Sequence, residues 1–283
     1  MSLSILITGG AGYVGSYLGP RLAAMPSCRV DLLNADVTAP ELELPDADVV
    51  IHLAGKLNSF NGPPDEIERV NHGGTINLAR KLARRGGRTH FVFLSTDQVF
   101  RSDAARVYTE EDPVAPETAY GRSKANAEAF LLSTLDRVTI LRTAVLHGYS
   151  HPRRRNTVEF IESKLRAGEP IELYQDVFAC PTFIGDLAAC VRRVLVERVV
   201  GVHHACGLEY VSRCDIAALL CAARGYDPGL IHPIARPDTS NIPRHIHLRP
   251  SPALQDLLTS RLHETLVREP HAGTAVSAQT ALP

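Results

Sequence analysis

The sequence contains no long apolar run, although 45% of its 283 residues are hydrophobic. A membrane-spanning helix requires roughly 18 consecutive apolar residues, so the sequence argues against a membrane protein. The chain opens with Met1-Ser-Leu-Ser, which leads directly into a short apolar run, and it shows no signal-peptide pattern. We therefore expect a cytoplasmic protein with no membrane partner.

The chain also lacks an excess of either charge. Its 30 Lys and Arg residues nearly balance its 31 Asp and Glu residues, and the net charge of −1 argues against a nucleic-acid or membrane-surface role. The six cysteines form no Cys-x-x-Cys pair, so we predict reduced and mostly buried thiols. The 12 histidines show no zinc-ligand spacing, so we predict no metal site.

Glycine is concentrated in one segment near the start of the chain. A buried-strand pattern over residues 3–8 leads into Gly9-Gly-Ala-Gly12-Tyr-Val-Gly15, and residues 16–24 have the pattern of a helix. Glycines in this arrangement permit a tight turn and a close approach of the backbone to a pyrophosphate, which the free N–H groups of the helix would hold. The segment predicts a dinucleotide-binding site. The alternative is a strand–helix turn that binds no ligand.

Tyr120 and Lys124 form a second informative pattern, 24 and 28 residues after Thr96. Residues four apart lie on one face of a helix, and a nearby ammonium favours phenolate, so Lys124 would lower the pKa of Tyr120. The pattern predicts a proton-transfer site. The alternatives are an aromatic side chain that packs on the sheet and, for Thr96, a strand-end hydroxyl that satisfies a backbone group.

Strand patterns alternate with helix patterns along the first half of the chain. Further strands are expected at residues 29–33, 48–53, 90–94 and 138–142. Further helices are expected at residues 64–85, 119–133, 157–167, 186–197, 214–224 and 253–267. This order predicts an α/β protein with a Rossmann-type doubly wound parallel sheet and a smaller C-terminal substrate-binding lobe.

The same order suggests a division into domains. We expect an NAD(P)-binding Rossmann domain over residues 1–148, to which segments around 170–205 return. Residues 149–268 would form most of the substrate-binding lobe. Residues 269–283 are small and polar and predict a disordered tail.

Several motifs run in order along almost the whole chain. They are Thr8-Gly-Gly-Ala-Gly-Tyr-Val-Gly15, Asp36-Val-Thr38, His52-Leu-Ala-Gly55, Asn71, Leu94-Ser-Thr-Asp-Gln-Val-Phe100, Tyr120-x-x-x-Lys124, Leu141-Arg-Thr143 and Pro181-Thr-x-x-x-Asp-Leu-Ala188. Together they resemble the motifs of extended short-chain dehydrogenase/reductases, and most closely those of the dTDP-4-dehydrorhamnose reductases. The short link between the second and third strands points the same way.

The resemblance implies an NAD(P)-dependent oxidoreductase that reduces a keto group on a nucleotide-activated deoxysugar. Thr96 would hydrogen-bond the substrate carbonyl and the Tyr120 hydroxyl. Tyr120 would deliver a proton as hydride arrives from the nicotinamide. Lys124 would bind the nicotinamide ribose and lower the pKa of Tyr120.

The resemblance also implies two sets of binding residues. Besides Tyr120 and Lys124, the cofactor would contact Gly9, Gly12, Tyr13, Val14, Gly15, Asn34, Asp36, Val37, Leu53, Ala54, Gly55 and Asn71. The substrate would contact Asp97, Gln98, Thr143, Pro181 and Thr182. Asn71 could instead be purely structural, Asp97 could be a strand-end cap, and Pro181-Thr182 could be an ordinary loop.

The chain departs from the family pattern at several positions. Asn34 stands where an acid would bind the ribose of NAD and repel the phosphate of NADP, so the cofactor is NADPH or NADH, with NADPH favoured. Gln98 and His147 each stand where tyrosine is more usual, which indicates an altered substrate pocket. The cationic segment Ser150-His-Pro-Arg-Arg-Arg155 could bind a nucleotide diphosphate or form a solvated face.

Two alternatives to the reductase stay open at this stage. An epimerase or dehydratase of the same superfamily would use the same three residues but retain NAD through its cycle. A regulatory subunit would bind the dinucleotide and a partner protein without catalysis, although it would have no need of a proton donor at Tyr120. We also consider a homodimer possible.

Overall fold

The computed structural model describes residues 2–57, 63–86, 88–149, 151 and 156–267. The expected disordered tail and most of the cationic segment at 150–155 lie outside these residues. No helix among the described residues has the length and apolar character needed to cross a membrane. The six cysteines are free, and four of them are buried, as the sequence predicted.

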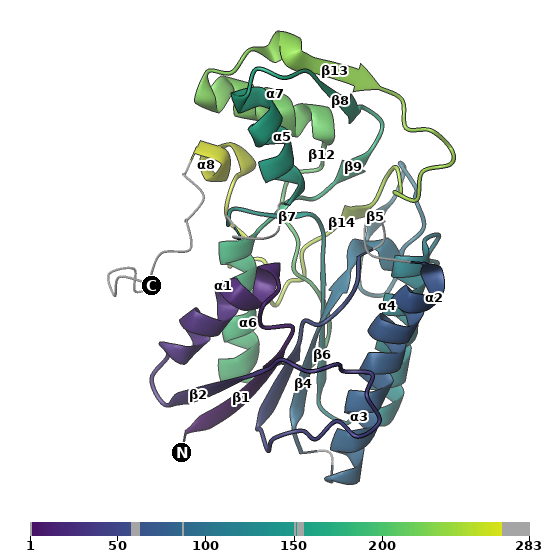
Figure 1. The fold of residues 1–283 in the computed structure, drawn as a ribbon, viewed down its shortest axis with the longest axis vertical. Helices are drawn as coiled ribbons and strands as arrows, with labels where there is room; N and C mark the ends of the chain where they lie inside the picture. Colours follow the sequence, from purple (N-terminus) through teal and green to yellow (C-terminus); the bar gives the residue numbers. More distant parts are fainter. Residues whose placement is uncertain (1, 58–62, 87, 150, 152–155, 268–283) are drawn as a thin grey trace.

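A six-stranded parallel sheet forms the centre of the larger part of the molecule (Figure 1). In spatial order its strands are β11 (Gly201–His204), β6 (Val138–Thr143), β4 (His90–Thr96), β3 (Val49–His52), β1 (Leu3–Thr8) and β2 (Cys28–Leu33). The chain passes from β1 to β2 at one edge and then returns to add β3 on the other side of β1. In open α/β sheets, ligands bind beyond the carboxyl ends of the strands at such a reversal of strand order.

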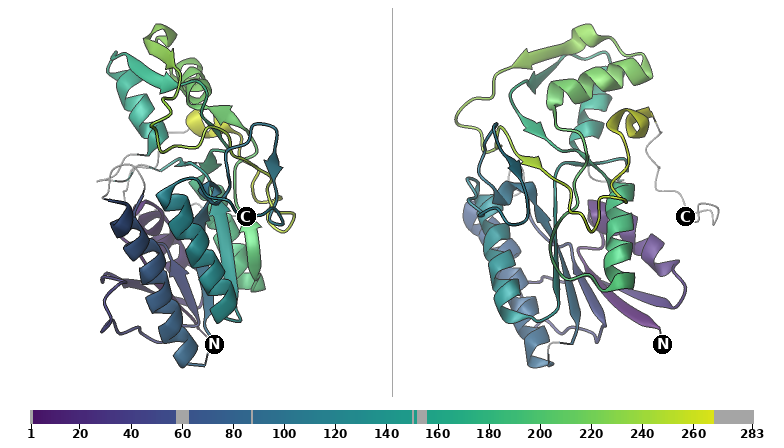
Figure 2. Two further views of the ribbon diagram at one scale, coloured as in Figure 1. Left: turned by 90° about the vertical axis from the view of Figure 1, so that its right-hand side faces the viewer. Right: turned by 180° about the vertical axis from the view of Figure 1, so that it is seen from behind.

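Helices cover both faces of this sheet (Figures 1 and 2). One face packs against α1 (Tyr13–Ala23) and α6 (Ile184–Glu197). The other packs against α3 (Gly74–Arg84) and α4 (Ala119–Thr134), and α2 (Pro64–Glu68) leads into α3 through a π-helical turn, η1 (Arg69–Gly73). Side chains of β1 alternate between the two cores, with Ile5 and Ile7 in the first and Leu6 in the second.

A smaller lobe lies above the carboxyl ends of the strands in the view of Figure 1. It contains α5 (Thr157–Arg166), α7 (Arg213–Arg224), α8 (Leu262–Val267) and the parallel pair of β8 (Ile171–Tyr174) and β13 (Ile231–Ile234). These elements share a hydrophobic core of their own. Capping boxes begin two of the helices, with Asn156 and Glu159 at α5 and Ser212 and Asp215 at α7.

Three short strand pairs connect the lobe to the strand ends. They are β5 (Val107–Tyr108) with β14 (His247–Leu248), β7 (Leu146–His147) with β10 (Thr182–Phe183), and β9 (Phe178–Ala179) with β12 (Val211–Ser212). Two 3-10 turns, η2 (Asp97–Val99) and η3 (Pro228–Leu230), complete the elements.

The predicted fold class is confirmed, but one predicted helix is mostly wrong. Residues 252–257 form successive turns, and only Leu262–Val267 is helical within the expected 253–267. Leu254 and Leu258 fill the core beneath α1 and α6, and Ser260 hydrogen-bonds Asp186 of α6. These long-range contacts hold the segment along the sheet domain instead of in a free helix.

Two strands from the region around residues 170–205 pair in different parts of the molecule. β11 joins the main sheet beside β6, whereas β8 pairs with β13 in the lobe. The division into domains at the stated boundaries therefore stays a prediction.

Candidate active site

The glycine-rich turn after β1 is shaped by contacts that exclude a side chain. Gly9 has φ +68°, and a Cβ there would lie 2.6 Å from the backbone nitrogen of Ala54. A Cβ on Gly15 would lie 2.5 Å from the carbonyl oxygen of Gly9. Gly12 caps α1 without a side-chain hydrogen bond, so no side chain occupies the first-turn N–H groups. This cradle fits the pyrophosphate of a dinucleotide.

The loop after β3 brings small residues next to Lys124. Leu53 and Ala54 are partly buried, and Gly55 is exposed. A Cβ on Gly55 would lie 3.0 Å from Asn71 Oδ1 and 3.7 Å from Lys124 Nζ. Glycine therefore leaves room beside the ammonium group.

Asn71 holds this loop from the π-helical turn. Its Oδ1 accepts a hydrogen bond from the Lys56 N–H at 2.7 Å, and its Nδ2 donates to the Lys56 carbonyl at 2.9 Å and to Ser123 Oγ at 3.0 Å. The side chain is 1% exposed. The amide thus joins the β3 loop to α4, which favours the structural role among the two that the sequence left open.

The end of β2 is more open. Asn34 is exposed, and the Asp36 carboxylate accepts hydrogen bonds from the backbone N–H and hydroxyl of Thr38. Val37 is buried in the core of the α3 and α4 face. Arg69, from the π-helical turn, donates to Thr38 Oγ1 at 2.5 Å and is half exposed. A cation therefore lies close to the end of β2, which the sequence did not predict.

Thr96 ends β4 and is 6% exposed. Its hydroxyl donates to Asp97 Oδ1 at 2.9 Å and accepts from the Gln98 N–H at 3.2 Å, so it also caps η2. Burial raises the pKa of Asp97 to about 6, against the hydrogen bonds that it accepts.

Tyr120 lies in the first turn of α4, where the Thr118 side chain caps the helix. Its side chain lies next to that of Thr96. Burial, together with the nearby Asp97 carboxylate, raises the pKa of Tyr120, and the neighbouring Thr96 side chain opposes this only in part. Contrary to the sequence-based expectation, Lys124 does not contribute to the shift of the Tyr120 pKa, so the predicted lowering of this pKa is wrong.

Lys124 lies one turn further along α4. Its Nζ donates to the Leu94 carbonyl at 2.9 Å and lies 4.4 Å from the centroid of the Phe93 ring. Burial lowers the pKa of Lys124 to about 8, while the charge of Glu128 acts in the opposite direction. The ammonium is anchored by the backbone of β4 and is directed toward the β3 loop at Gly55.

Sequence reasoning missed a buried ion pair beneath the site. Arg142 and Glu128 are about 5% exposed and pair at 2.7 Å, and Ser95 also hydrogen-bonds Glu128. The pair ties α4 to β4 and β6. The only sequence signal was the position of Glu128 one helical turn after Lys124.

The predicted substrate residues occupy different environments. Thr143 lies opposite Thr96 in the register of β6 and β4, and its buried hydroxyl has no hydrogen-bond partner among the described residues. Gln98 accepts a hydrogen bond from Thr118. Pro181 and Thr182 are buried, and the Thr182 hydroxyl is bonded within the protein. Among the described residues, Thr143 is therefore the member of this set whose polar group is buried without a partner.

Tyr13 and Val14 both pack against the core between α1 and the sheet, Val14 buried and Tyr13 partly buried. The Tyr13 hydroxyl accepts from the Tyr149 N–H at 3.2 Å and from Asn156 Nδ2 at 3.0 Å. The Tyr13 side chain thus connects the glycine-rich turn to the start of α5 in the lobe.

His147, one of the departures from the family pattern, is buried, and burial lowers its pKa to about 4. It lines a cavity of about 20 Å³ together with residues of α5, α7 and α8. That volume holds about one water molecule and no sugar.

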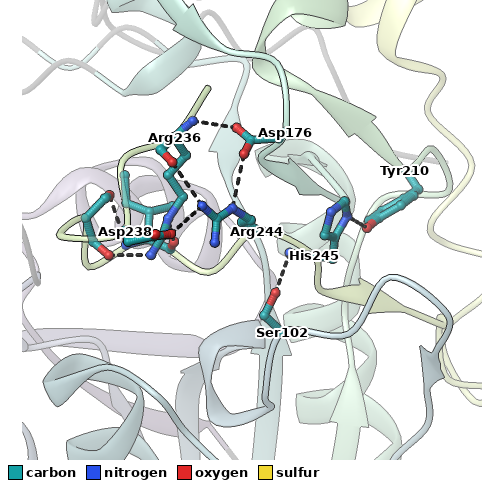
Figure 3. Close-up of polar contacts among 9 residues, drawn as sticks. Ser102, Asp176, Tyr210, Arg236, Asp238, Arg244 and His245 are labelled. Atoms are coloured by element: carbon teal, nitrogen blue, oxygen red, sulfur yellow. Dashed lines mark hydrogen bonds and ion pairs between the residues drawn. The ribbon is translucent and has the colours of Figure 1, made fainter. Parts of the chain in front are cut away.

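A loop of the lobe approaches the strand ends from above (Figure 3). Asp176 accepts hydrogen bonds from the Arg236 N–H and from Arg244, which also pairs with Asp238. Next to Arg244, the His245 N–H donates to Ser102 Oγ, shortly after η2. The loop therefore connects β9 of the lobe to the segment that follows Thr96 and Asp97.

The chain is similar to known proteins along most of its length. The RmlD substrate binding domain family matches residues 3–270. A Streptomyces antibioticus protein named "Probable dTDP-4,6-dihydroxy-2-methyloxan-3-one 4-ketoreductase" is 33% identical over 81% of this chain and 79% of its own length. A dTDP-4-dehydrorhamnose reductase of Mycolicibacterium smegmatis is 29% identical over 82% and 73%.

A solved structure has the same fold. The dTDP-4-dehydrorhamnose reductase of Bacillus anthracis, in complex with NADP, has a TM-score of 0.82 and 21% identity over 94% of this chain and 98% of that one. At this identity the likeness supports the fold alone. On the family match, the chain belongs to the RmlD substrate binding domain family, which confirms the resemblance carried by its sequence motifs.

Proposed function

We propose that this protein is an NAD(P)H-dependent reductase of a keto group on a nucleotide-activated deoxysugar. The observation that carries the proposal is the placement of Tyr120 next to Thr96 at the carboxyl end of β4, with Lys124 one helical turn away. Relatives that match most of the chain are named as ketoreductases of dTDP-linked sugars, which supports this substrate class.

The residues at the strand reversal suit a dinucleotide. The turn from Gly9 to Gly15 and the first turn of α1 would hold the pyrophosphate, Asp36 and Val37 would lie near the adenine, and Lys124 would bind the nicotinamide ribose. When bound, the reduced nicotinamide supplies the hydride. The fit of a dinucleotide to this turn is supported by the close contacts at Gly9 and Gly15, which leave backbone rather than side chains at the surface of the turn.

We favour NADPH over NADH. Asn34 presents no charge that would repel a 2′-phosphate. The half-exposed Arg69 contacts Thr38, on the segment that follows Asn34 in the sequence. Asp36 lies 3.9 Å from Arg69 and partly offsets its charge, so the preference is expected to be modest.

Tyr120 is suited to giving up a proton. Because burial and Asp97 raise its pKa, Tyr120 is protonated at neutral pH and can act as the acid. An alkoxide is a far stronger base than a phenolate, so transfer from Tyr120 to the developing alkoxide is favourable. General acid catalysis of this kind typically contributes about 10²–10⁴ in rate.

The sugar would lie beyond Thr96, between the strand ends and the lobe. Thr143 offers a buried hydroxyl without a partner among the described residues, and Gln98 and Asp97 follow Thr96 directly. Pro181 and Thr182 would shape this region through the backbone rather than by direct polar contact. We propose that residues 149–268 supply most of the substrate-binding lobe. A cytoplasmic location and a homodimer stay predictions.

The test is oxidation of NADPH and NADH, in parallel, with a panel of dTDP-linked 4-keto-6-deoxysugars. We expect turnover with at least one sugar and loss of turnover in Tyr120→Phe. Net conversion of sugar without consumption of reduced cofactor would instead indicate an isomerase that retains NAD. Cofactor binding with no turnover on any sugar would favour a regulatory subunit.

A further inference from the structure

The Thr96 hydroxyl has several polar neighbours but only one proton to donate. It donates to Asp97 Oδ1 at 2.9 Å and accepts from the Gln98 N–H at 3.2 Å, and the Tyr120 side chain lies next to it. A hydroxyl has a single proton to donate, and an ionised carboxylate can only accept. While Asp97 is ionised, Thr96 can therefore act toward Tyr120 only as an acceptor.

This arrangement is unfavourable for a ketone. A carbonyl oxygen that becomes an alkoxide is stabilised by hydrogen-bond donors, and Thr96 and Tyr120 are the two hydroxyl groups that the proposed mechanism places at this oxygen. With Asp97 ionised, the Thr96 proton points to Asp97, and Thr96 can only accept a hydrogen bond from Tyr120. If Asp97 takes up a proton, it no longer requires a donor, and the Thr96 proton becomes available for the substrate.

The surroundings of Asp97 permit this change near neutral pH. Asp97 is 8% exposed, and burial raises its pKa to about 6. The other titratable groups that face it are Tyr120 from α4, Cys180 before β10 and Cys206 after β11. Burial raises the pKa of all three, so they are neutral at pH 7 and Asp97 is the group that changes charge.

We propose that Asp97 is a positioning residue that sets the direction of the Thr96 hydroxyl. Ionised, Asp97 holds the Thr96 proton and leaves Tyr120 hydrogen-bonded to Thr96. Protonated, Asp97 releases that proton toward the substrate oxygen. The role goes beyond a contact with a sugar hydroxyl, because Asp97 acts through Thr96 and depends on its own protonation state.

The first test needs no substrate and so does not depend on the proposed function. Protein labelled with ¹³C at the tyrosine Cζ atom is followed by NMR from pH 5 to pH 8, and the Tyr120 signal is identified by its loss in Tyr120→Phe. We expect this signal to shift with a midpoint near pH 6, the pKa of Asp97. The shift should vanish in Asp97→Asn and shrink by at least half in Thr96→Val, which removes the hydroxyl between the two groups.

An unchanged Tyr120 signal in the wild-type protein would overturn the proposal. A shift of the same size in Thr96→Val would also overturn it, because Asp97 would then act on Tyr120 directly through its charge. Asp112→Asn is the matched control, since Asp112 pairs with Arg106 away from Thr96, and it should leave the shift intact.

The second test rests on the proposed function and uses NADPH oxidation with dTDP-4-dehydrorhamnose or the panel sugar that turns over fastest. We expect kcat to fall about fivefold as pH rises from 5 to 7.5, the equivalent of one neutral hydrogen bond. Asp97→Asn should remove this step, and Asp97→Glu should restore it. A raised KM in Asp97→Asn with an unchanged pH profile would show a plain sugar contact and overturn the proposal. If no sugar turns over, the NMR result alone decides.

Discussion

A Cβ atom on Gly121 would lie 2.1 Å from the carbonyl oxygen of Gln98. The first turn of α4 therefore packs directly on the backbone of η2, which follows Thr96 at the end of β4. This contact places Tyr120 next to Thr96. A residue with no side chain thus sets how close the two side chains lie.

Gly121→Ala should separate them. The added methyl group cannot be accommodated without moving α4 away from η2. Because displacement of catalytic groups lowers the rate of the chemical step, we expect turnover to fall at least about tenfold. We also expect a loss of about 1–3 kcal/mol in the free energy of unfolding. Sugar-dependent NADPH oxidation and urea denaturation measure the two effects.

Gly73→Ala is the matched control for that variant. Gly73 is also helical, and a Cβ there would meet no atom within 4 Å. Alanine is favoured over glycine in a helix by about 0.5–1 kcal/mol, so this variant should be equally or more stable and should keep its activity. Equal behaviour of the two variants would contradict the role assigned to Gly121.

Tyr120→Phe should retain cofactor binding and lose turnover. The ring still fits its site, but the proton donor is gone, so we expect a fall of at least about a hundredfold in kcat with a nearly unchanged Kd for NADPH. Fluorescence titration of NADPH and the oxidation assay give the two values. Tyr108→Phe removes a buried hydroxyl that bonds the Arg101 carbonyl and should keep most of the activity. Near-normal turnover of Tyr120→Phe would remove Tyr120 from the mechanism.

Asn34→Asp should shift the cofactor preference toward NADH. A carboxylate at the end of β2 would repel the 2′-phosphate of NADPH and accept a hydrogen bond from the ribose of NADH. We expect kcat/KM with NADPH to fall at least about tenfold, which corresponds to about 1.4 kcal/mol, and kcat/KM with NADH to hold or rise. Asn34→Ala removes the amide without adding charge and should leave the preference unchanged. If both variants lose NADPH equally, charge at this position is not the cause.

Four buried histidines should make the protein sensitive to mild acid. Burial lowers the pKa of His52 to about 3 and the pKa values of His90, His147 and His204 to about 4. In an unfolded chain, histidines bind protons near pH 6.5. Between pH 6.5 and 4 the unfolded state therefore binds more protons than the folded state, and the free energy of unfolding decreases as the pH decreases.

The raised pKa of Asp97 acts in the opposite direction over part of this window, since the folded state then binds its proton first. Asp97 offsets one of the four histidines, and each of the other three contributes at most about 1.4 kcal/mol per pH unit. The free energy of unfolding therefore decreases by at most about 4 kcal/mol for each pH unit of acidification. Urea midpoints at pH 7.5, 6.5 and 5.5 should decrease in that order. A constant midpoint would mean that these histidines titrate alike in both states.

Much of the fold could be predicted because its signals are local. The strand patterns at 3–8, 90–94 and 138–142 and the glycine-rich turn depend on residues close in the sequence, and the structure contains all of them. The helix at 253–267 failed because Leu254 and Leu258 are held by the core of the sheet domain, a partner that the local pattern cannot reveal.

The candidate site could likewise be predicted only in part. The order and spacing of Thr96, Tyr120 and Lys124 were visible in the sequence, because spacing on a helix and order along a chain are one-dimensional properties. The direction in which the Tyr120 pKa shifts was not visible, since it depends on burial and on the Asp97 carboxylate of η2, against which the first turn of α4 packs. By itself the sequence determined the sheet, the glycine-rich turn and the order of Thr96, Tyr120 and Lys124. Only the tertiary structure decided which proton lies where, because desolvation and charge act between residues that are distant in the chain and adjacent in space.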